Sequence, residues 1–476
     1  MKGKNFSVAL QRTKYVAMDF ATSSLAFFLF NICRYFLIES SSVFGRQSLW
    51  SYLGTPLLII EQIFIPLGYL GIYWLSGYYN RPVLRSRVTE FSVTLISVMV
   101  GTIIIYLLLL INDSSGIKTR DYEVILIFYF LFAFLVYIGR CIITGSTISH
   151  LRQRKWKYSI LIVGNSRKSR TIYDRLQHAH SVWTYDVIGF IRLPNENSVK
   201  DGMTVWDLKD VEKICNEYDI DQIILAPENI RDTDIMNTLS LLFPIGKPVK
   251  IAPDTLSFVT GNIRLNDILG IPFIDLTSPR LNEFEKNLKR SFDVLASVLT
   301  MILLSPLLCL TAILVKKSSK GPVIYSQERM GRGKRPFKIL KFRSMYVDAE
   351  KTGPMLSNDN DERVTRFGKF MRKYRIDELP QFWNVLKGEM SLVGPRPERE
   401  YYIRQIMERA PYYGLIFQVR PGVTSWGMVK YGYASSVSQM VERSRYDLLY
   451  INNMSVSTDL KIMIYTVRTV IKGAGI

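Results

Sequence analysis

The stretch KRSFDVLASVLTMILLSPLLCLTAILVKK, residues 289–317, decides how the second half of this chain is placed. Its apolar part, Phe292–Val315, is long enough to cross a membrane, but Ser305-Pro306 interrupts it and basic residues flank both ends. Proline breaks or kinks a helix, and lysine and arginine favour the cytoplasmic side. Two arms of roughly 18 Å each reach only part of the way into the hydrocarbon. We therefore predict a re-entrant helix over 289–317, bent at Ser305 and Pro306, with a fifth, kinked span as the alternative.

Four other apolar stretches precede this segment, over residues 15–38, 51–76, 91–111 and 122–143. Each has about the 20 residues that a membrane-spanning helix needs. Lysine and arginine are concentrated in the N-terminal tail, in the second loop and after the fourth stretch, so the N-terminus and the chain after residue 150 are expected to start in the cytoplasm. The first stretch contains Asn31 and Arg34 and no small-residue cleavage site, so it is not expected to be a signal peptide. Residues 1–150 thus predict a four-helix transmembrane domain.

Residues 151–280 have the pattern of a Rossmann-like α/β domain. Apolar runs such as Tyr158–Gly164 alternate with helical stretches such as Ser169–Gln177, which is typical of a parallel sheet. The turn after the first run keeps only Gly164 of the G-x-G-x-x-G pattern that lets backbone approach a pyrophosphate. We therefore predict no use of NAD, and the ligand of this domain stays open.

The composition restricts the chemistry. The chain has 61 Lys and Arg against 41 Asp and Glu, a net charge of +20, which favours anionic partners such as phospholipid or a phosphorylated substrate. Nucleic acid is not expected as a partner, because much of the charge lies in loops beside the membrane. None of the three histidines lies beyond residue 180. A nucleophile with a histidine base is therefore excluded from the C-terminal half, where carboxylates, Lys, Arg, Tyr and hydroxyls remain.

The last domain, residues 281–476, contains an Asp-Glu pair between two predicted helices. Asp377 and Glu378 follow an amphipathic helix predicted over Val364–Tyr374 and precede one predicted over Gln381–Lys387. A positive helix end and nearby arginines favour ionised carboxylates. An ionised Asp can attack phosphorus while its neighbour holds a divalent cation. Taken alone, the pair is more typical of acidic residues that stabilise a helix terminus.

Several cations in this domain are candidate phosphate ligands. Lys341 and Arg343 alternate with apolar residues, and in a strand they would share one face. Arg396 lies between two prolines in a rigid loop suited to bidentate phosphate binding, and Arg420 precedes a Pro-Gly turn. The final segment, Thr458–Lys472, mixes apolar and basic residues, as either an interfacial helix or a core helix would.

Together these segments resemble the bacterial sugar transferases, the monotopic phosphoglycosyl transferase superfamily. The four predicted spans and the Rossmann-like domain look like its long subfamily. The resemblance implies a membrane protein with an α-helical transmembrane bundle, a cytoplasmic Rossmann-like α/β domain and a monotopic α/β catalytic domain with a re-entrant membrane helix. The matching stretches occur in family order and are Gln327–Arg329, Lys341–Met345, Asp377–Gln381, Trp383–Leu386, Ser391–Pro397 and Arg420–Gly422.

The resemblance also implies an activity, the transfer of a sugar-1-phosphate from a UDP-sugar to undecaprenyl phosphate with release of UMP. Asp377 would form a covalent phosphosugar and Glu378 would ligate Mg²⁺. The chain is most similar to members that transfer galactose-1-phosphate at the start of O-antigen synthesis. Transfer of glucose-1-phosphate, or an inactive scaffold or nucleotide sensor, are the alternatives. Phosphates would be held by Lys341, Arg343, Arg375, Arg396 and Arg420.

The same analogy gives the expected setting of the protein. It predicts a homodimer in the bacterial inner membrane, with the catalytic domain on the cytoplasmic face. An enzyme on that face meets both a cytoplasmic UDP-sugar and the head group of a polyprenyl phosphate.

Overall fold

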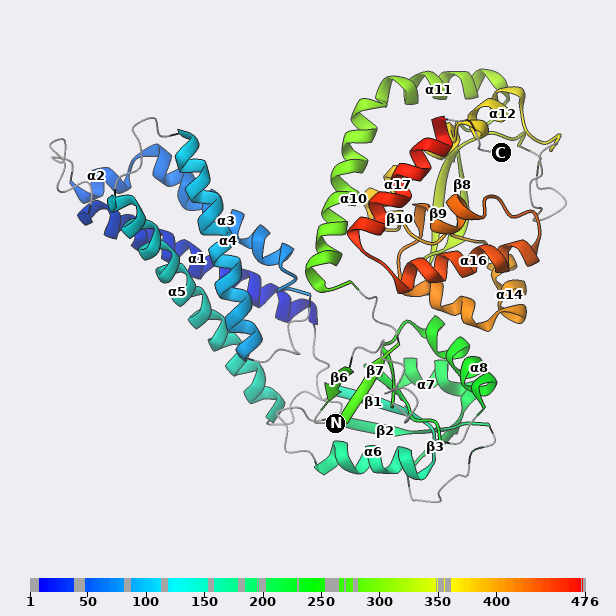
Figure 1. Ribbon diagram of the computed structural model, residues 1–476, viewed down its shortest axis with the longest axis horizontal. Coiled ribbons are helices and arrows are strands. Elements are labelled where there is room, and N and C mark those ends of the chain that lie inside the picture. The colour runs from blue at the N-terminus through cyan, green and yellow to red at the C-terminus, as the bar shows by residue number, and fades with distance from the viewer. Residues whose placement is uncertain are drawn as a thin grey trace. The chain divides into compact units, whose positions relative to one another are not determined.

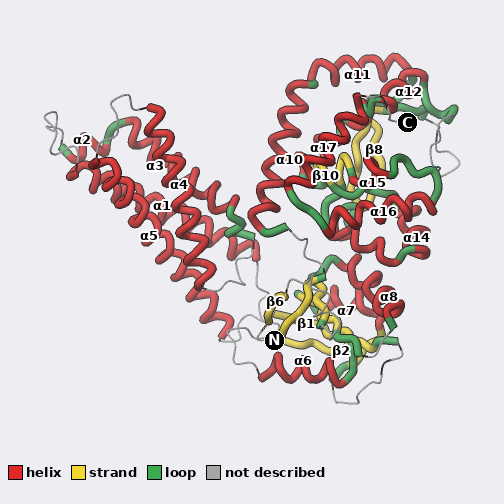
Figure 2. Tube along the Cα trace, viewed as in Figure 1, coloured by secondary structure: helices red, strands yellow, loops and turns green. Residues whose placement is uncertain are grey.

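The chain divides into two compact units, one consisting mainly of residues 1–157 and the other mainly of residues 158–476 (Figures 1 and 2). The computed structural model describes residues 8–37, 48–80, 87–112, 119–152, 158–178, 185–194, 196, 203–228, 231–252, 265–268, 271–276, 281–347, 349, 355, 361–471 and 473.

The first unit is helical. Among its described residues, four helices are long and apolar enough to span a membrane: α1 (Val8–Leu37), α3 (Pro56–Leu75), α4 (Arg87–Asn112) and α5 (Thr119–Arg152). A short helix, α2 (Leu49–Leu53), lies between the first two. Large apolar side chains such as Leu57, Phe64 and Phe130 are exposed, as lipid-facing residues are. The four predicted apolar helices are confirmed, and their length and composition are consistent with a membrane protein.

A buried charge cluster joins three of these helices. The Arg140 guanidinium on α5 donates to both carboxylate oxygens of Asp19 on α1, each at 2.8 Å, and to Thr94 on α4 at 2.8 Å. Glu90 on α4 accepts from the Tyr78 hydroxyl at 2.6 Å. Arg140, Asp19 and Glu90 are fully buried. Because ionisable groups are costly inside a membrane domain unless they are paired, this cluster restricts how the helices can pack.

The second unit begins with the Rossmann-like domain. Its seven-stranded sheet has the order β3-β2-β1-β4-β5-β7-β6, and α6 covers one face while α7 and α8 cover the other (Figure 1). The predicted buried strands are confirmed, but the sheet is not wholly parallel, because β7 pairs antiparallel with both β5 and β6. The strands are β1 (Tyr158–Val163), β2 (Tyr185–Arg192), β3 (Val205–Asp207), β4 (Gln222–Leu225), β5 (Val249–Ile251), β6 (Leu265–Ile268) and β7 (Ile271–Asp275), and the helices are α6 (Arg167–His178), α7 (Val211–Glu217) and α8 (Asp232–Leu242).

The segment predicted to re-enter the membrane forms two helices, α10 (Glu283–Leu303) and α11 (Ser305–Ser318), bent by 64°. The break falls at Ser305-Pro306, where proline occupies the first turn of α11. Much of the pair's apolar surface is exposed, including Leu295, Ile302, Leu303, Leu310 and Ile313.

Both ends of this helix pair are attached to the same domain. At one end, Lys289 donates to Asp459 at 2.5 Å and Arg290 donates to the Val385 carbonyl at 2.8 Å. At the other, the Arg343 guanidinium donates to the carbonyls of Val315 and Ser319. A helix pair that crossed the bilayer would separate these ends. Attachment of both to one domain therefore favours the re-entrant arrangement, which stays a prediction.

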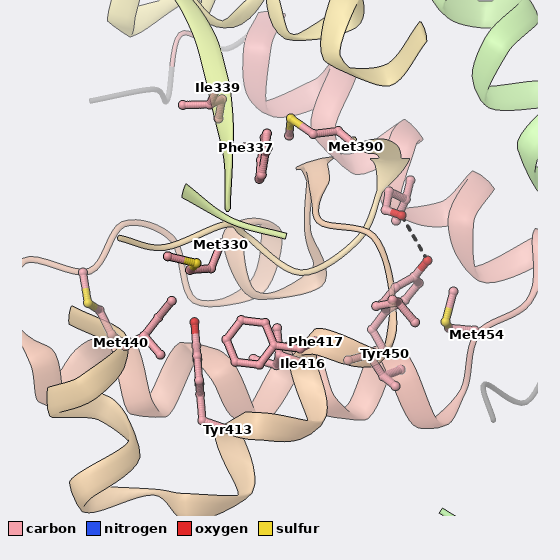
Figure 3. Packing of buried hydrophobic residues seen from close by; sticks show 14 of the residues in the cluster. Met330, Phe337, Ile339, Met390, Tyr413, Ile416, Phe417, Met440, Tyr450 and Met454 are labelled. Atoms are coloured by element: carbon pink, nitrogen blue, oxygen red, sulfur yellow. Dashed lines mark hydrogen bonds between the residues drawn. The ribbon is translucent and has the colours of Figure 1, made fainter. Parts of the chain in front are cut away.

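The remaining elements of residues 281–476 are mainly helical around two small sheets. An antiparallel hairpin of β8 (Ile324–Met330) and β9 (Pro336–Phe342) pairs Arg329 with Phe337, and β10 (Ser391–Val393) pairs in parallel with β11 (Gly422–Thr424). Figure 3 shows Met330, Phe337 and Ile339 of the hairpin in one core with Tyr413 and Tyr450. The helices are α12 (Arg366–Lys373), α13 (Gln381–Lys387), α14 (Glu400–Arg409), α15 (Trp426–Lys430), α16 (Val437–Asn452) and α17 (Val456–Ile471), with short 3-10 turns η4 (Arg332–Lys334), η5 (Ile376–Glu378) and η6 (Pro411–Gln418).

We expect Arg140→Met to destabilise the helix bundle by roughly 3–5 kcal/mol, because it leaves the buried Asp19 carboxylate without its cation. Replacing both charges, with Asp19→Asn and Arg140→Met, is expected to cost less. The temperature at which the detergent-solubilised protein loses its monodisperse gel-filtration peak measures this. Arg87→Gln, at the exposed start of α4, is the control. Equal losses in the single and double variants would contradict the role of the pair.

We expect a cysteine at exposed Lys317 to react with a membrane-impermeant maleimide only from the cytoplasmic side. The background has Cys33, Cys141, Cys215 and Cys309 replaced by serine. Ser48→Cys, between the first two spans, is the control for the opposite side. Labelling of Lys317→Cys in intact cells would show that the α10–α11 pair crosses the membrane.

Candidate active site

The Asp-Glu pair lies on a short turn between two helices. Helix α12 is capped at its start by Thr365, whose hydroxyl accepts from the Gly368 amide at 2.9 Å, and it ends at Lys373. Arg375 then adopts a left-handed conformation (φ 54°), which non-glycine residues rarely do. This reversal leads into η5, where Asp377 and Glu378 are both buried. The predicted helices on either side of the pair are confirmed.

One buried side chain holds this turn against the β8–β9 hairpin. Asn384 on α13 accepts from the Leu340 amide at 3.0 Å and donates to the Lys338 carbonyl at 2.8 Å. The Asn384 side chain therefore pairs with the β9 backbone as a neighbouring strand would. It is completely buried. A buried amide with both groups satisfied specifies one register between the two elements. This fixes Lys341, on the same strand, opposite Glu378.

Three cations surround the Glu378 carboxylate. Lys341 Nζ lies 2.7 Å from Oε1, Arg396 lies 3.5 Å from the same oxygen, and Arg375 lies 3.4 Å from Oε2. Burial acts to raise the pKa of Glu378, but Lys341, Arg396 and Arg375 outweigh it and hold the pKa well below its usual range. Glu378 is therefore ionised, as predicted.

Asp377 differs from its neighbour. Burial raises the pKa of its carboxyl above the usual range, and the charge of Glu378 adds to this, although Lys341 acts in the opposite direction. Lys341, Arg372 and Arg375 do favour ionisation of Asp377, as predicted, but desolvation outweighs them and leaves its pKa above the usual range. Two adjacent carboxyls with oppositely shifted pKa values are typical of an active site.

The pair lines a cavity of about 420 Å³, a volume typical of small-molecule sites. It is strongly basic: of the described residues that line it, three are carboxylates, Asp377, Glu378 and Glu398, and eight are cations. Such a lining suits a ligand with several negative charges. The cations are Arg329, Lys341, Arg343, Arg372, Arg375, Arg396, Arg399 and Arg443.

The loop that carries Arg396 is held by Asp447 and flanked by Glu398, neither of which the sequence assigned a role. The Arg396 amide donates to Asp447 at 3.3 Å, and Asp447 also accepts from the Gly427 amide. Beside it, Glu398 accepts from Arg443 at 2.5 Å and from Arg329 at 3.3 Å. Arg443 lies on the buried side of α16, and a cation at a buried helical position is a signal that could have identified it.

Two predicted phosphate ligands are placed differently from the rest. Arg343 does not act with Lys341 as a pair, because β9 ends at Phe342. The Arg343 guanidinium donates to carbonyls at the end of α11 and to that of Pro322 just beyond it, although it also lines the cavity. Arg420 does not line the described cavity and donates to the Gly388 carbonyl at 2.9 Å. Arg375 and Arg396 do lie beside Asp377 and Glu378, as Lys341 does.

The Asp377-Glu378 pair fits a metal ion that takes some of its ligands from the substrate and water, rather than one held by protein ligands alone. Among the described residues there is no group of three or more His, Cys, Asp or Glu that could hold a metal ion. Mg²⁺, however, commonly takes one or two carboxylates and completes its shell with substrate phosphates and water. The ionised Glu378 is a suitable hard ligand, provided that Lys341 moves away from Oε1.

The Rossmann-like domain has a carboxylate at the turn where a dinucleotide fold binds phosphate. Gly164 has the expected left-handed backbone (φ 126°). The next amide, of Asn165, donates at 2.7 Å to Glu196, and that side chain also accepts from the Leu193 amide. An acidic side chain thus uses the backbone donor that would otherwise be directed at an anion.

A family model described as bacterial sugar transferase matches residues 284–473, and one described as a CoA-binding domain matches residues 75–240. A UDP-N-acetylgalactosamine-undecaprenyl-phosphate N-acetylgalactosaminephosphotransferase from Aeromonas hydrophila is 46% identical over 40% of this chain and 44% of its own length. A UDP-galactose-lipid carrier transferase from Erwinia amylovora is 29% identical over 68% of this chain and 70% of its own length.

A third relative is a UDP-glucose:undecaprenyl-phosphate glucose-1-phosphate transferase from Caulobacter vibrioides. It is 41% identical over 38% of this chain and 68% of its own length. This chain spans only about half of the length of the Aeromonas hydrophila relative (44%) and of a UDP-glucose:undecaprenyl-phosphate glucose-1-phosphate transferase from Klebsiella pneumoniae (54%). The sugar transferase match includes the α10–α11 pair, the cavity and the Asp377-Glu378 turn. This chain therefore belongs to the bacterial sugar transferase family.

Proposed function

We propose that this protein transfers a sugar-1-phosphate from a UDP-sugar to undecaprenyl phosphate and releases UMP. The observation that carries the proposal is the buried Asp377-Glu378 pair in a basic cavity beside an exposed apolar helix pair. The cations match a diphosphate, and the apolar helices match a substrate held in a membrane. The names of the three relatives, with different sugars, agree with this reaction class.

In the first step, an ionised Asp377 oxygen attacks the β-phosphorus of the UDP-sugar. The bond from that phosphorus to the bridging oxygen breaks, its electron pair stays with the α-phosphate, and UMP leaves. The sugar phosphate is then an acyl phosphate ester on Asp377. Lys341, Arg375 and Arg396 lie beside the pair and offset the charge that develops on the phosphate oxygens.

In the second step, a phosphate oxygen of undecaprenyl phosphate attacks the same phosphorus. The bond to the Asp377 oxygen breaks, and the carboxylate is regenerated together with the diphosphate-linked sugar. Glu378 stays ionised throughout because cations beside it, Arg375 and Arg396 among them, outweigh its burial. We propose that it also contributes to a Mg²⁺ site, and such a metal would neutralise part of the diphosphate charge when bound.

We propose galactose as the first sugar to test, with glucose as the alternative, and the relatives add N-acetylgalactosamine. We also propose that the protein is a homodimer in the bacterial inner membrane, with its active site on the cytoplasmic face and a role at the start of O-antigen synthesis. UDP-sugars are cytoplasmic, so an active site on that face can reach its donor.

We expect Asp377→Asn to lose at least about a thousandfold in UMP release with the fold intact, because an amide cannot serve as the nucleophile. The assay uses purified protein, Mg²⁺ and undecaprenyl phosphate with UDP-galactose, UDP-glucose or UDP-N-acetylgalactosamine. With radiolabelled UDP-sugar and no acceptor, the unaltered protein should retain label through denaturation and the variant should not. Near-normal turnover by Asp377→Asn would remove the nucleophile from the proposal.

The matched control is Glu378→Gln, which changes the neighbouring carboxylate and leaves Asp377 in place. We expect it to retain some labelling at high Mg²⁺ concentration and to need more Mg²⁺ than the unaltered protein. An unchanged Mg²⁺ dependence would argue against Glu378 as a ligand. If the unaltered protein releases no UMP from any of the three donors, the transferase proposal fails.

The pH dependence should follow the raised pKa of Asp377. The nucleophile must be ionised, so kcat/KM for the UDP-sugar is lost as pH falls through this pKa, above the ordinary value of about 4. Lys341→Met removes a charge that lowers the pKa, so the acid limb should move to higher pH. Lys338→Met, an exposed cation on the same strand, is the control. An acid limb that does not move in Lys341→Met would contradict this coupling.

A further inference from the structure

The stereochemistry of the two proposed steps restricts where UMP, the lipid acceptor and the sugar can lie in the cavity. In phosphoryl transfer, the attacking and leaving oxygens lie roughly in line with phosphorus. The same Asp377 oxygen attacks in the first step and leaves in the second. The oxygen of UMP and the oxygen of the acceptor must therefore use the same side of the phosphorus, one after the other. The sugar ester is not broken in either step, so the sugar can stay in one place.

The two steps need an open route through which UMP leaves and the lipid phosphate enters, and a separate place for the sugar. Two parts of the cavity wall, called here the buried end and the exposed end, differ in their exposure. One end is lined by Met428, Ala434 and Met440, which are 6%, 1% and 4% exposed. The other is lined by Tyr346 and Val347, which are 52% and 64% exposed.

The two ends also differ in their relation to the apolar helices. Figure 1 shows α11 and α12 at one end of the β8–β9 hairpin and α14 and α16 at the other. At the first end, Phe342 of the cavity wall packs with Val315 of α11 and Met371 of α12. The exposed end of the cavity is therefore adjacent to the lipid-facing helices, and the buried end is formed by the α14–α16 region.

We infer that the buried end, with Tyr433 in its wall, is the subsite that holds the sugar and selects which UDP-sugar is accepted. This rests on the proposed transferase function. Tyr433 is near enough to act electrostatically on Arg396, which contacts Glu378, so this wall begins next to the reacting phosphate. It combines an aromatic ring and thioethers with the charged groups of Glu398, Arg399 and Arg443. Apolar faces suit the C–H surface of a sugar, and charged groups can pair with its hydroxyls.

The test separates the sugar from the nucleotide. In an Asp377→Asn background, which prevents turnover, titration calorimetry with Mg²⁺ gives Kd for UDP and for each of the three UDP-sugars. For the UDP-sugar that supports UMP release, Kd for UDP divided by Kd for that UDP-sugar measures how much the sugar contributes to binding. We expect Tyr433→Ala to reduce this ratio at least about tenfold and to leave Kd for UDP unchanged, since a pocket selects a ligand through such contacts.

Two further variants complete the design. Tyr433→Leu keeps apolar volume and removes the ring and hydroxyl, so it gives the same readout if Tyr433→Ala does not fold, which thermal unfolding will show. Val347→Ala, at the exposed end, should leave the ratio unchanged and raise KM for undecaprenyl phosphate in an Asp377-intact background.

The outcomes distinguish the possibilities. If Tyr433→Ala weakens the binding of UDP and of the UDP-sugar equally, the nucleoside lies at the buried end and the inference is overturned. No change in either constant would overturn it as well. Failure of the unaltered protein to release UMP would instead remove the proposed reaction, whatever the binding ratio.

Discussion

The arrangement of this site depends on the ion pair between Lys341 on β9 and Glu378 on η5. The two charged atoms lie 2.7 Å apart and both side chains are largely buried, so neither retains its full hydration. Removing two charges from water is costly unless the geometry is good and other groups assist. Here Arg375 and Arg396 complete the surroundings of the carboxylate, and Asn384 holds the strand in the matching position. The consequence is an ionised Glu378 beside a less acidic Asp377.

This polar centre is joined directly to the apolar helix pair. Arg343 follows Lys341 by two residues and donates to carbonyls at the end of α11, and Gly321 (φ 131°) leaves room for its guanidinium. In the middle of α10, Asp293 accepts from the Ser391 hydroxyl at 2.6 Å and from the Leu392 amide. Cations that seemed to be phosphate ligands or topology signals thus also fasten the helices to the domain. An exposed apolar surface is thereby held at a fixed position beside the cavity.

The Arg396 loop shows how closely packed backbone can position a cation. Gly394 and Gly422 approach each other so closely that a Cβ on Gly422 would lie 2.1 Å from the Gly394 amide nitrogen. The Gly422 amide donates to the Pro395 carbonyl, and Asp447 accepts from the Arg396 amide. Asp447 and Asp459 have no obvious task in the sequence. In the structure one supports this loop and the other accepts from Lys289 and Tyr450.

The sequence by itself determined the local features: four apolar helices, the Rossmann-like strands, the break at Ser305-Pro306, and the turn with Asp377 and Glu378 between two helices. These follow from periodicity, proline and run length, which act over a few residues. Only the tertiary structure decided which cations meet the carboxylates, that Arg343 serves carbonyls, that Arg420 lies outside the cavity, and that Asp377 is less acidic than Glu378. Those outcomes depend on burial and on contacts between residues far apart in the chain, such as Glu378 with Lys341 and Glu398 with Arg443.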